Sequence, residues 1–145
     1  MPSIYGLTLH RPWCWCIAYG SKRIENRSWA PNRRHIGTHI AIHSGKQWDE
    51  VGAEAAWKID GHRIADAHVP PGQIIAVARL DSVISHAGDP PQDSPWLVGP
   101  MGWVLADVMI IHPVQCKGQQ GLWPIQDQLL ELVRESYRAA KRGKP

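Results

Sequence analysis

Polar and apolar residues alternate along several short stretches of the chain, which is the spacing of β-strands. In the stretch 37–43 the alternation places Ile40 and Ile42 on one face and His39 and His43 on the other. A longer apolar run, 73–85, has the length of a strand that bends around a barrel. The five or six predicted strands cover 4–10, 22–29, 37–43, 73–85, 103–113 and 122–125.

Helix signals occur between and after these stretches. Proline fits the first turn of a helix and glycine ends one, so Pro12 and Gly20 bound a short helix that ends at Tyr19. Residues 48–57 and 59–68 are predicted to form two helices separated near Gly61. The last helix, within 126–142, is amphipathic, and its predicted inner face consists of Leu129, Leu132, Val133 and Tyr137.

The order of these elements is not the repeated strand, helix, strand of a doubly wound sheet. Short strands interrupted by helices instead predict an α+β fold, a small mixed β-barrel of five to six strands with flanking helices. Residues 86–95, rich in proline, glycine and aspartate, have little to bury and are predicted to form an exposed loop.

The length of 145 residues, with 43% apolar residues, fits one domain over 1–145 and excludes disordered, collagen-like and coiled-coil proteins. No apolar run approaches the roughly 20 residues of a membrane-spanning helix, and the first residues lack the pattern of a secretory leader. We therefore expect a soluble cytoplasmic protein with no membrane partner.

Charge and tryptophan change this picture of an ordinary domain. Residues 1–46 hold seven basic side chains against one acidic one, residues 47–107 hold three against nine, and the remainder holds six against three. The basic first third also contains three of the eight tryptophans. Cations for phosphates beside aromatic rings for bases are typical of a nucleic-acid surface, although a solvated charged surface has the same composition.

The three cysteines, Cys14, Cys16 and Cys116, have no pair at zinc-ribbon spacing. We expect three free thiols in a reducing compartment, no metal and no cofactor. A zinc site of Cys14, Cys16, His39 and His43 is the alternative, but cysteines two positions apart on a helix point their sulfur atoms in different directions.

The most specific pattern is spread over several segments. It comprises Leu-Thr-Leu-His-Arg-Pro-Trp at 7–13, Gly-Ser-Lys-Arg-Ile-Glu-Asn-Arg-Ser-Trp at 20–29, Gly37 with Ile-Ala-Ile-His at 40–43, Gly-Pro-Met-Gly-Trp-Val-Leu at 99–105 and Gly-Leu-Trp at 121–123. Together these segments resemble the ASCH domain, the activating signal cointegrator homology family of the PUA-like superfamily. The resemblance extends from Ile4 to Ile125.

This resemblance implies a PUA-like barrel with a cleft between the barrel and the first helix, and a role in binding RNA or a modified nucleotide. Cations there match phosphates, tryptophans stack bases, and Glu25 accepts a hydrogen bond from an amino group on a base edge. The candidate binding residues are Arg11, Trp13, Lys22, Glu25, Arg27, Trp29, Lys46 and Trp103. Because side chains alternate along a strand, Lys22 and Glu25 share one cleft only if Lys22 lies in the turn after Gly20 or a bulge intervenes.

Simpler interpretations stay open for each residue. Lys22 and Glu25 have the spacing of a surface ion pair. At least one of Trp13, Trp29 and Trp103 is expected to be purely structural. His10 and His43 fit hydrogen-bonded residues at strand ends. A protein adaptor acting through the basic C-terminal helix is a third class of function.

Catalysis is the alternative to binding. Some small members of the family remove the acetyl group from N4-acetylcytidine with a Lys and a Thr at K-x-x-T and a downstream Glu. Lys22 matches that lysine, but Glu25 stands at the threonine position, where a carboxylate cannot replace a hydroxyl nucleophile. A variant mechanism would use Lys22, Glu25 and His43, with Glu25 as general base. Other members are associated with RNA cleavage, for which His10, Lys22 and His43 are the acid–base candidates.

Overall fold

The computed structural model describes residues 3–85 and 94–143, and these residues form an α+β fold built on a six-stranded sheet. The strands are β1 (Ile4–Arg11), β2 (Ile24–Arg27), β3 (His39–Trp48), β4 (Gln73–Ser85), β5 (Met101–Gln115) and β6 (Leu122–Pro124). The α-helices are α1 (Trp13–Ala18), α2 (Glu50–Ala55) and α3 (Asp127–Arg142). The predicted fold class is therefore confirmed.

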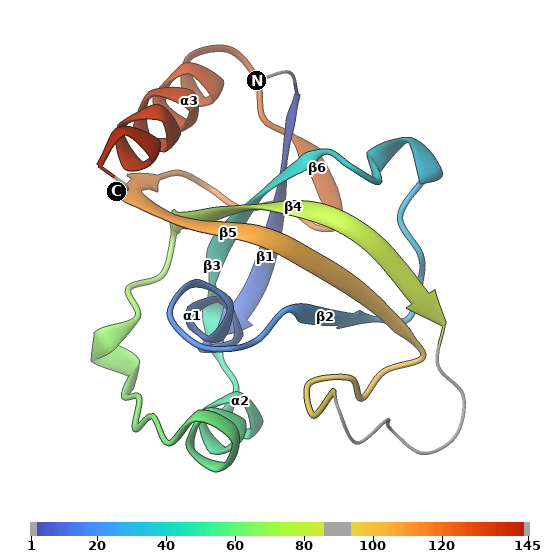
Figure 1. Ribbon diagram of the computed structural model, residues 1–145. Helices are drawn as coiled ribbons and strands as arrows, with labels where there is room; N and C mark the ends of the chain where they lie inside the picture. Colours follow the sequence, from blue (N-terminus) through green and yellow to red (C-terminus); the bar gives the residue numbers. More distant parts are fainter. Residues whose placement is uncertain (1–2, 86–93, 144–145) are drawn as a thin grey trace.

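The sheet is mixed, and its strand order is β2-β5-β4-β3-β1-β6. β1 and β3 run parallel, with Thr8 opposite His43, and the other neighbours are antiparallel. β4 and β5 form a long, strongly curved pair that crosses the molecule (Figure 1). The sheet curls toward a barrel but does not close, because β2 at one edge is not paired with β6 at the other.

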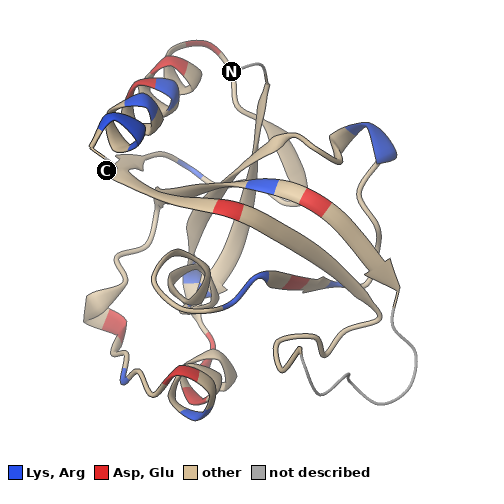
Figure 2. Ribbon diagram, in the orientation of Figure 1, with Lys and Arg blue, Asp and Glu red and all other residues tan. Residues whose placement is uncertain are grey.

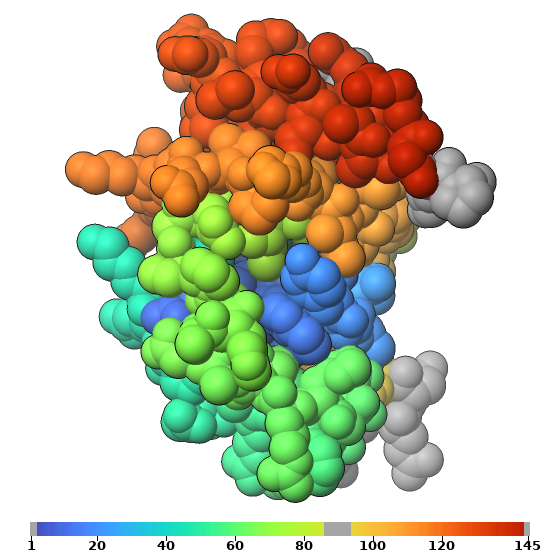
Figure 3. All heavy atoms as spheres, turned by 90° about the vertical axis from the view of Figure 1, so that its left-hand side faces the viewer, coloured from blue at the N-terminus to red at the C-terminus, as the bar shows by residue number. Residues whose placement is uncertain are grey.

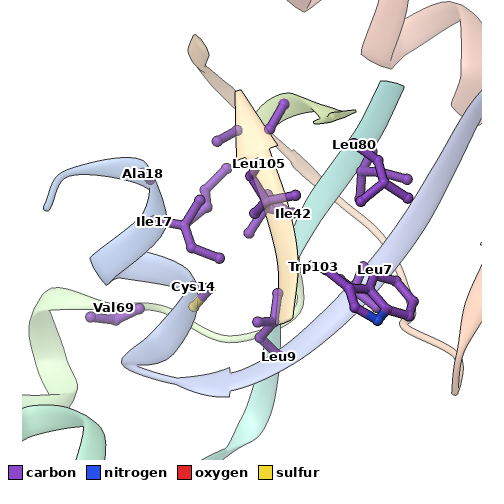
Figure 4. Close-up of a cluster of buried hydrophobic side chains, with 14 residues drawn as sticks. Leu7, Leu9, Cys14, Ile17, Ala18, Ile42, Val69, Leu80, Trp103 and Leu105 are labelled. Atoms are coloured by element: carbon purple, nitrogen blue, oxygen red, sulfur yellow. The ribbon is translucent and has the colours of Figure 1, made fainter. Parts of the chain in front are cut away.

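A hydrophobic core fills the inside of this curled sheet. Leu7, Ile42, Leu80 and Trp103 are completely buried there, and Ile17 of α1 packs onto the same cluster. Figure 4 shows these side chains pointing toward one another from β1, β3, β4, β5 and α1. The helix α1 thus covers one opening of the curled sheet.

A second core lies on the opposite face of the sheet, beneath α3. Ala41, next to Ile40 and Ile42 in β3, belongs to this second cluster, as strand alternation predicts. Val133 and Tyr137 are buried inward-facing residues of α3, and Leu129 is partly buried against them. The fourth predicted member of the inner face, Leu132, is 46% exposed, so that assignment is wrong.

Other boundaries also differ from the sequence prediction. β3 continues beyond His43 to Trp48, because it pairs with β1 as far as Arg11 opposite Trp48 and the Arg11 side chain binds the carbonyls of Gly45 and Lys46. The predicted helix over 59–68 is wrong. A π-helical turn, Ala56–Asp60, extends α2 to Gly61, and only a short 3-10 turn, Asp66–His68, follows. Most of the predicted loop 86–95 lies outside the described residues.

Candidate functional site

Lys22 lies in the turn between α1 and β2 and is one of the most deeply buried side chains of the protein, 1% exposed. β2 begins only at Ile24, so strand alternation does not apply to Lys22, as one of the two predicted arrangements requires. Its Nζ donates to the carbonyl oxygen of Ile24. It also lies 5.0 Å from the ring centroid of Trp13 and 5.5 Å from that of Trp96. Two indole faces therefore enclose this ammonium group.

Glu25 and Arg27 continue the charged group from Lys22. The Glu25 carboxylate is 3.8 Å from Lys22 Nζ through Oε1 and 3.1 Å from Arg27 Nε through Oε2. Burial raises the pKa of Glu25, and the two cations partly offset this effect. Burial likewise lowers the pKa of Lys22, against the opposing attraction of Glu25. Both shifts favour the neutral forms, which is the environment expected for groups that bind or exchange a proton.

Arg27 connects this group to β1 across the open side of the sheet. Its Nη2 donates to the Thr8 carbonyl oxygen at 3.3 Å. The Thr8 hydroxyl lies 3.2 Å from His43 Nδ1, and the other ring nitrogen of His43 lies 2.9 Å from the Cys116 carbonyl oxygen. Because that carbonyl only accepts, His43 Nε2 carries the proton and Nδ1 accepts from Thr8. His43 thus lies at the end of the network and is connected to the buried ion pairs through Thr8 and Arg27.

The tryptophans around the group have different surroundings. Trp103, opposite Glu25 in the β2–β5 pair, is completely buried and donates from Nε1 to the Trp29 carbonyl oxygen at 3.1 Å. The Trp29 ring stands edge-on to Trp103 at 4.9 Å and is 41% exposed. Trp29 therefore offers the accessible ring, while Trp103 lies in the core. Trp13 is half-buried, and its Nε1 donates to Asp49 at 2.9 Å.

Arg11, Lys46 and His10 do not join this group. Arg11 is buried and donates to the carbonyl oxygens of Gly45, Lys46 and Val69, besides its ion pair with Asp66. These contacts connect the ends of β1 and β3 to the segment 66–69 and leave few donors of the Arg11 guanidinium available for a phosphate. The side chains of Lys46 and His10 are exposed near these strand ends.

A surface hollow of about 290 Å³ lies directly beside the charged group. It is lined by Ser21, Arg23, Ile24, Ser94, Pro95 and Trp96. Three residues of the predicted cleft segment 20–29 thus form one wall, but Lys22, Glu25 and Arg27 are not among the lining residues. Trp96 forms the other wall, and its Nε1 donates to the Ser21 hydroxyl at 3.0 Å. Behind that wall is Lys22, the residue that Trp96 covers.

Trp96, Ser21 and Thr8 are the residues of this site that sequence reasoning missed. Trp96 is 70 residues from Asn26, whose side chain bonds its backbone, and no local pattern indicates that approach. Tryptophan after the turn-forming pair Ser94-Pro95 is the one signal that the sequence contains. Thr8 was visible within the 7–13 motif, but only the parallel pairing with β3 brings it to His43.

Charges are distributed in space as well as along the chain. Figure 2 shows Lys and Arg along the segment that enters β2 and on the last turns of α3, with acidic residues on α2, β4 and β5. Within residues 3–85 and 94–143 no cluster of three or more His, Cys, Asp or Glu side chains is arranged to hold a metal ion. Nor does this part of the chain contain a helix long and apolar enough to cross a membrane.

Comparisons with known proteins find a matching family model and similar solved structures. The family model of the ASCH domain matches residues 7–92. The solved structure of the ASCH protein from Zymomonas mobilis has a TM-score of 0.57 at 14% identity, covering 91% of this chain and 94% of that one. A serine-to-alanine variant of the same protein gives 0.58 at 13% identity, covering 91% and 94%. These likenesses confirm the predicted PUA-like fold. Among curated proteins there is no match.

Proposed function

This chain belongs to the ASCH domain family, and on that premise we propose that it binds RNA or a modified nucleotide beside Lys22, Glu25 and Arg27. The observation that carries the proposal is the buried Glu25 carboxyl group, which contacts Lys22 and Arg27 and follows Ile24, a residue that lines an open hollow. A carboxylate oxygen accepts from the amino group of a cytosine or adenine edge, and the cations attract phosphate.

Two further contacts support a nucleotide as the ligand. Trp29 presents a 41% exposed ring that the core tryptophan Trp103 holds in place. A base that stacks on such a ring gains about 1–3 kcal/mol by the usual truncation measure. The Arg23 side chain, at the rim of the hollow, is exposed and positively charged.

The test is a titration with single-stranded RNA at several salt concentrations, followed by tryptophan fluorescence. We expect quenching, with an affinity that falls steeply as salt rises because phosphate contacts release counterions. Glu25→Gln keeps the shape of the side chain and Trp29→Ala removes the exposed ring. Each is expected to weaken binding about tenfold or more.

Glu131→Gln is the matched control, because Glu131 is an exposed carboxylate that pairs with an arginine on α3. It should leave the affinity unchanged. Equal affinity of the wild type, Glu25→Gln and Trp29→Ala proteins would contradict the proposed site, and the absence of any salt-dependent quenching would contradict nucleic-acid binding altogether.

Amide hydrolysis is the second candidate, favoured by the opposed pKa shifts of the Lys22–Glu25 pair. Neutral lysine and protonated glutamate differ from the ionised pair only by the position of one proton, so the pair is suited to general acid–base work. Incubation with N4-acetylcytidine tests this candidate. Release of acetate that Lys22→Met abolishes in a folded protein would favour the hydrolase, and binding without product would exclude it.

A further inference from the structure

An exposed group of aromatic and basic side chains lies outside the site described above. It consists of the half-buried Trp15 on α1, Tyr19 just after α1, and Trp57, His62 and Arg63 at the end of the α2 region, and is called the aromatic shelf below. Tyr19 is 52% exposed and Trp57 is 48% exposed. Figure 3 looks onto this side of the molecule, where α1 (blue) adjoins the segment that follows α2 (green).

The rings of the aromatic shelf support one another. Trp15 lies 5.4 Å from Tyr19 with the planes tilted by 31°, and the His62 ring stands edge-on to Trp15 at 5.1 Å. The guanidinium carbon of Arg63 lies 4.2 Å from the ring centroid of Trp57. Rings that are held by neighbours lose less conformational entropy when a planar ligand stacks on them.

The local backbone explains why these residues meet. The π-helical turn Ala56–Asp60 ends at Gly61, whose φ of 71° is in the left-handed region that glycine tolerates best. The chain reverses there, so that His62 returns toward Trp15 while Arg63 lies on Trp57.

Charge decides what kind of ligand fits. Of the nearby acids, Glu54 pairs with Lys58 at 2.8 Å. Asp60 accepts from the backbone amide and hydroxyl of Ser21 at 2.8 and 2.6 Å and keeps its negative charge. Arg63, by contrast, has no acidic partner among the described residues, and its contact is with Trp57. The shelf therefore combines stacking faces with a cation available to a phosphate.

The shelf is also continuous with the hollow. Ser21 lines the hollow and binds Asp60, the residue that precedes Gly61. A nucleic-acid strand that leaves the hollow at Ser21 therefore comes close to Tyr19 and His62, which lie two positions from Ser21 and Asp60 in the sequence. The hollow and the shelf together offer a path for several nucleotides rather than a pocket for one.

We propose that the aromatic shelf binds single-stranded nucleic acid by stacking its bases, extending a strand whose first nucleotide occupies the hollow beside Lys22 and Glu25. This inference rests on the proposed function, and it adds the strandedness of the ligand and a second contact surface. Stacking on aromatic faces tolerates any base, so the shelf contributes affinity with little sequence preference.

The test compares two labelled oligoribonucleotides, of about three and about ten nucleotides, by fluorescence anisotropy. The longer strand is expected to bind at least about tenfold more tightly to the wild type. Trp57→Ala should remove about tenfold of affinity for the long strand and leave the short strand unchanged. Arg63→Gln should weaken long-strand binding and reduce its salt dependence, because one phosphate contact is lost.

Matched controls lie on α3, away from both surfaces. Leu132→Ala removes another exposed apolar side chain, and Arg138→Gln another exposed arginine, and neither should alter either affinity. If Trp57→Ala and Arg63→Gln bind the long strand as the wild type does, the shelf proposal is overturned while the proposed function stands. If neither strand binds the wild type, both proposals are overturned.

Discussion

The three sulfur atoms differ in their surroundings, and this difference decides their reactivity. Burial raises the pKa of Cys14 to about 12 and that of Cys16 to about 11. Partial burial also raises the pKa of Cys116, but this thiol is the one that is partly exposed. Because the thiolate is the reactive form, only Cys116 is expected to react with a disulfide reagent at neutral pH in the folded protein. Counting released chromophore before and after denaturation checks this, and rapid reaction of all three native thiols would contradict it.

Burial of histidine side chains makes the stability of the protein depend on pH below neutrality. Burial lowers the pKa of His43 below its ordinary value of 6.5, and it also lowers those of His35 and His39. The unfolded chain then binds more protons than the folded one as the pH falls below about 6.5. The contribution of these histidines to stability is therefore fully present above this pH and is expected to be lost as the pH falls through the lowered values.

Urea unfolding on either side of that window measures the effect. His43→Asn has no ring to protonate and should show a shallower loss of stability toward acid than the wild type. His10→Asn is the control, because His10 is exposed. A loss of stability toward acid that is as steep in His43→Asn as in the wild type would contradict the role of His43.

Residue identity predicted part of the site, and burial determined the rest. Lys22, Glu25 and Arg27 come together because they lie within six positions of one turn and strand, which a local motif can specify. Arg11 belongs to the same motif region, yet its donors are taken by carbonyls from β3 and the segment 66–69. No sequence pattern specifies that Trp96 covers Lys22, because the two residues are far apart in the sequence.

At the level of elements, a glycine in β1 leaves room for a tryptophan ring of β6. Gly6 lies opposite Trp123, and a Cβ at position 6 would lie 2.3 Å from Cε2 of that ring. Gly6→Ala is therefore expected to destabilise the protein by about 1–3 kcal/mol, because either the indole or β6 must move. Urea unfolding measures the change.

Gly143→Ala is the matched control for this substitution, since a Cβ at position 143 has no atom nearer than 3.7 Å. It should change the stability by a few tenths of a kcal/mol at most. Trp123→Leu introduced together with Gly6→Ala should restore part of the loss relative to the two single variants, and strictly additive losses would contradict the proposed clash.

The bounds of helices and strands with a clear hydrophobic period were predicted well. The bounds of segments whose structure depends on distant contacts were not. β4 and α3 each combine a long hydrophobic pattern with clear end signals, and their observed bounds are within a residue of the prediction. The segment 59–68 has helix-compatible residues, but Asp60 binds Ser21 in the turn after α1, Asp66 pairs with Arg11 of β1, and Ile64 packs on the core. Tertiary contacts therefore overrode a weak local preference.

For the whole molecule, the open side of the sheet is the feature that the predicted barrel lacked. β2 is a four-residue edge strand that, among the described residues, forms a ladder only with β5. Arg27, which pairs with Glu25 on the same strand, links β2 to β1 through the Thr8 carbonyl. Side chains thus bridge a gap that backbone hydrogen bonds leave open. The site is located at this gap, so closure of the fold and integrity of the site depend on the same arginine.

Arg27→Gln tests that dependence. It removes a partly buried charge-assisted contact, so we expect a loss of about 1.5–3 kcal/mol in the free energy of unfolding. The surface arginine Arg79, which pairs with Asp81 and Asp107, is the control, and Arg79→Gln should cost at most about 1 kcal/mol. Hydrogen exchange locates the effect, because local opening should accelerate exchange at 24–27 while the amides of β3 and β4 stay protected. Equal acceleration throughout the sheet would show that Arg27 stabilises the whole fold without specifically holding β2 across the gap.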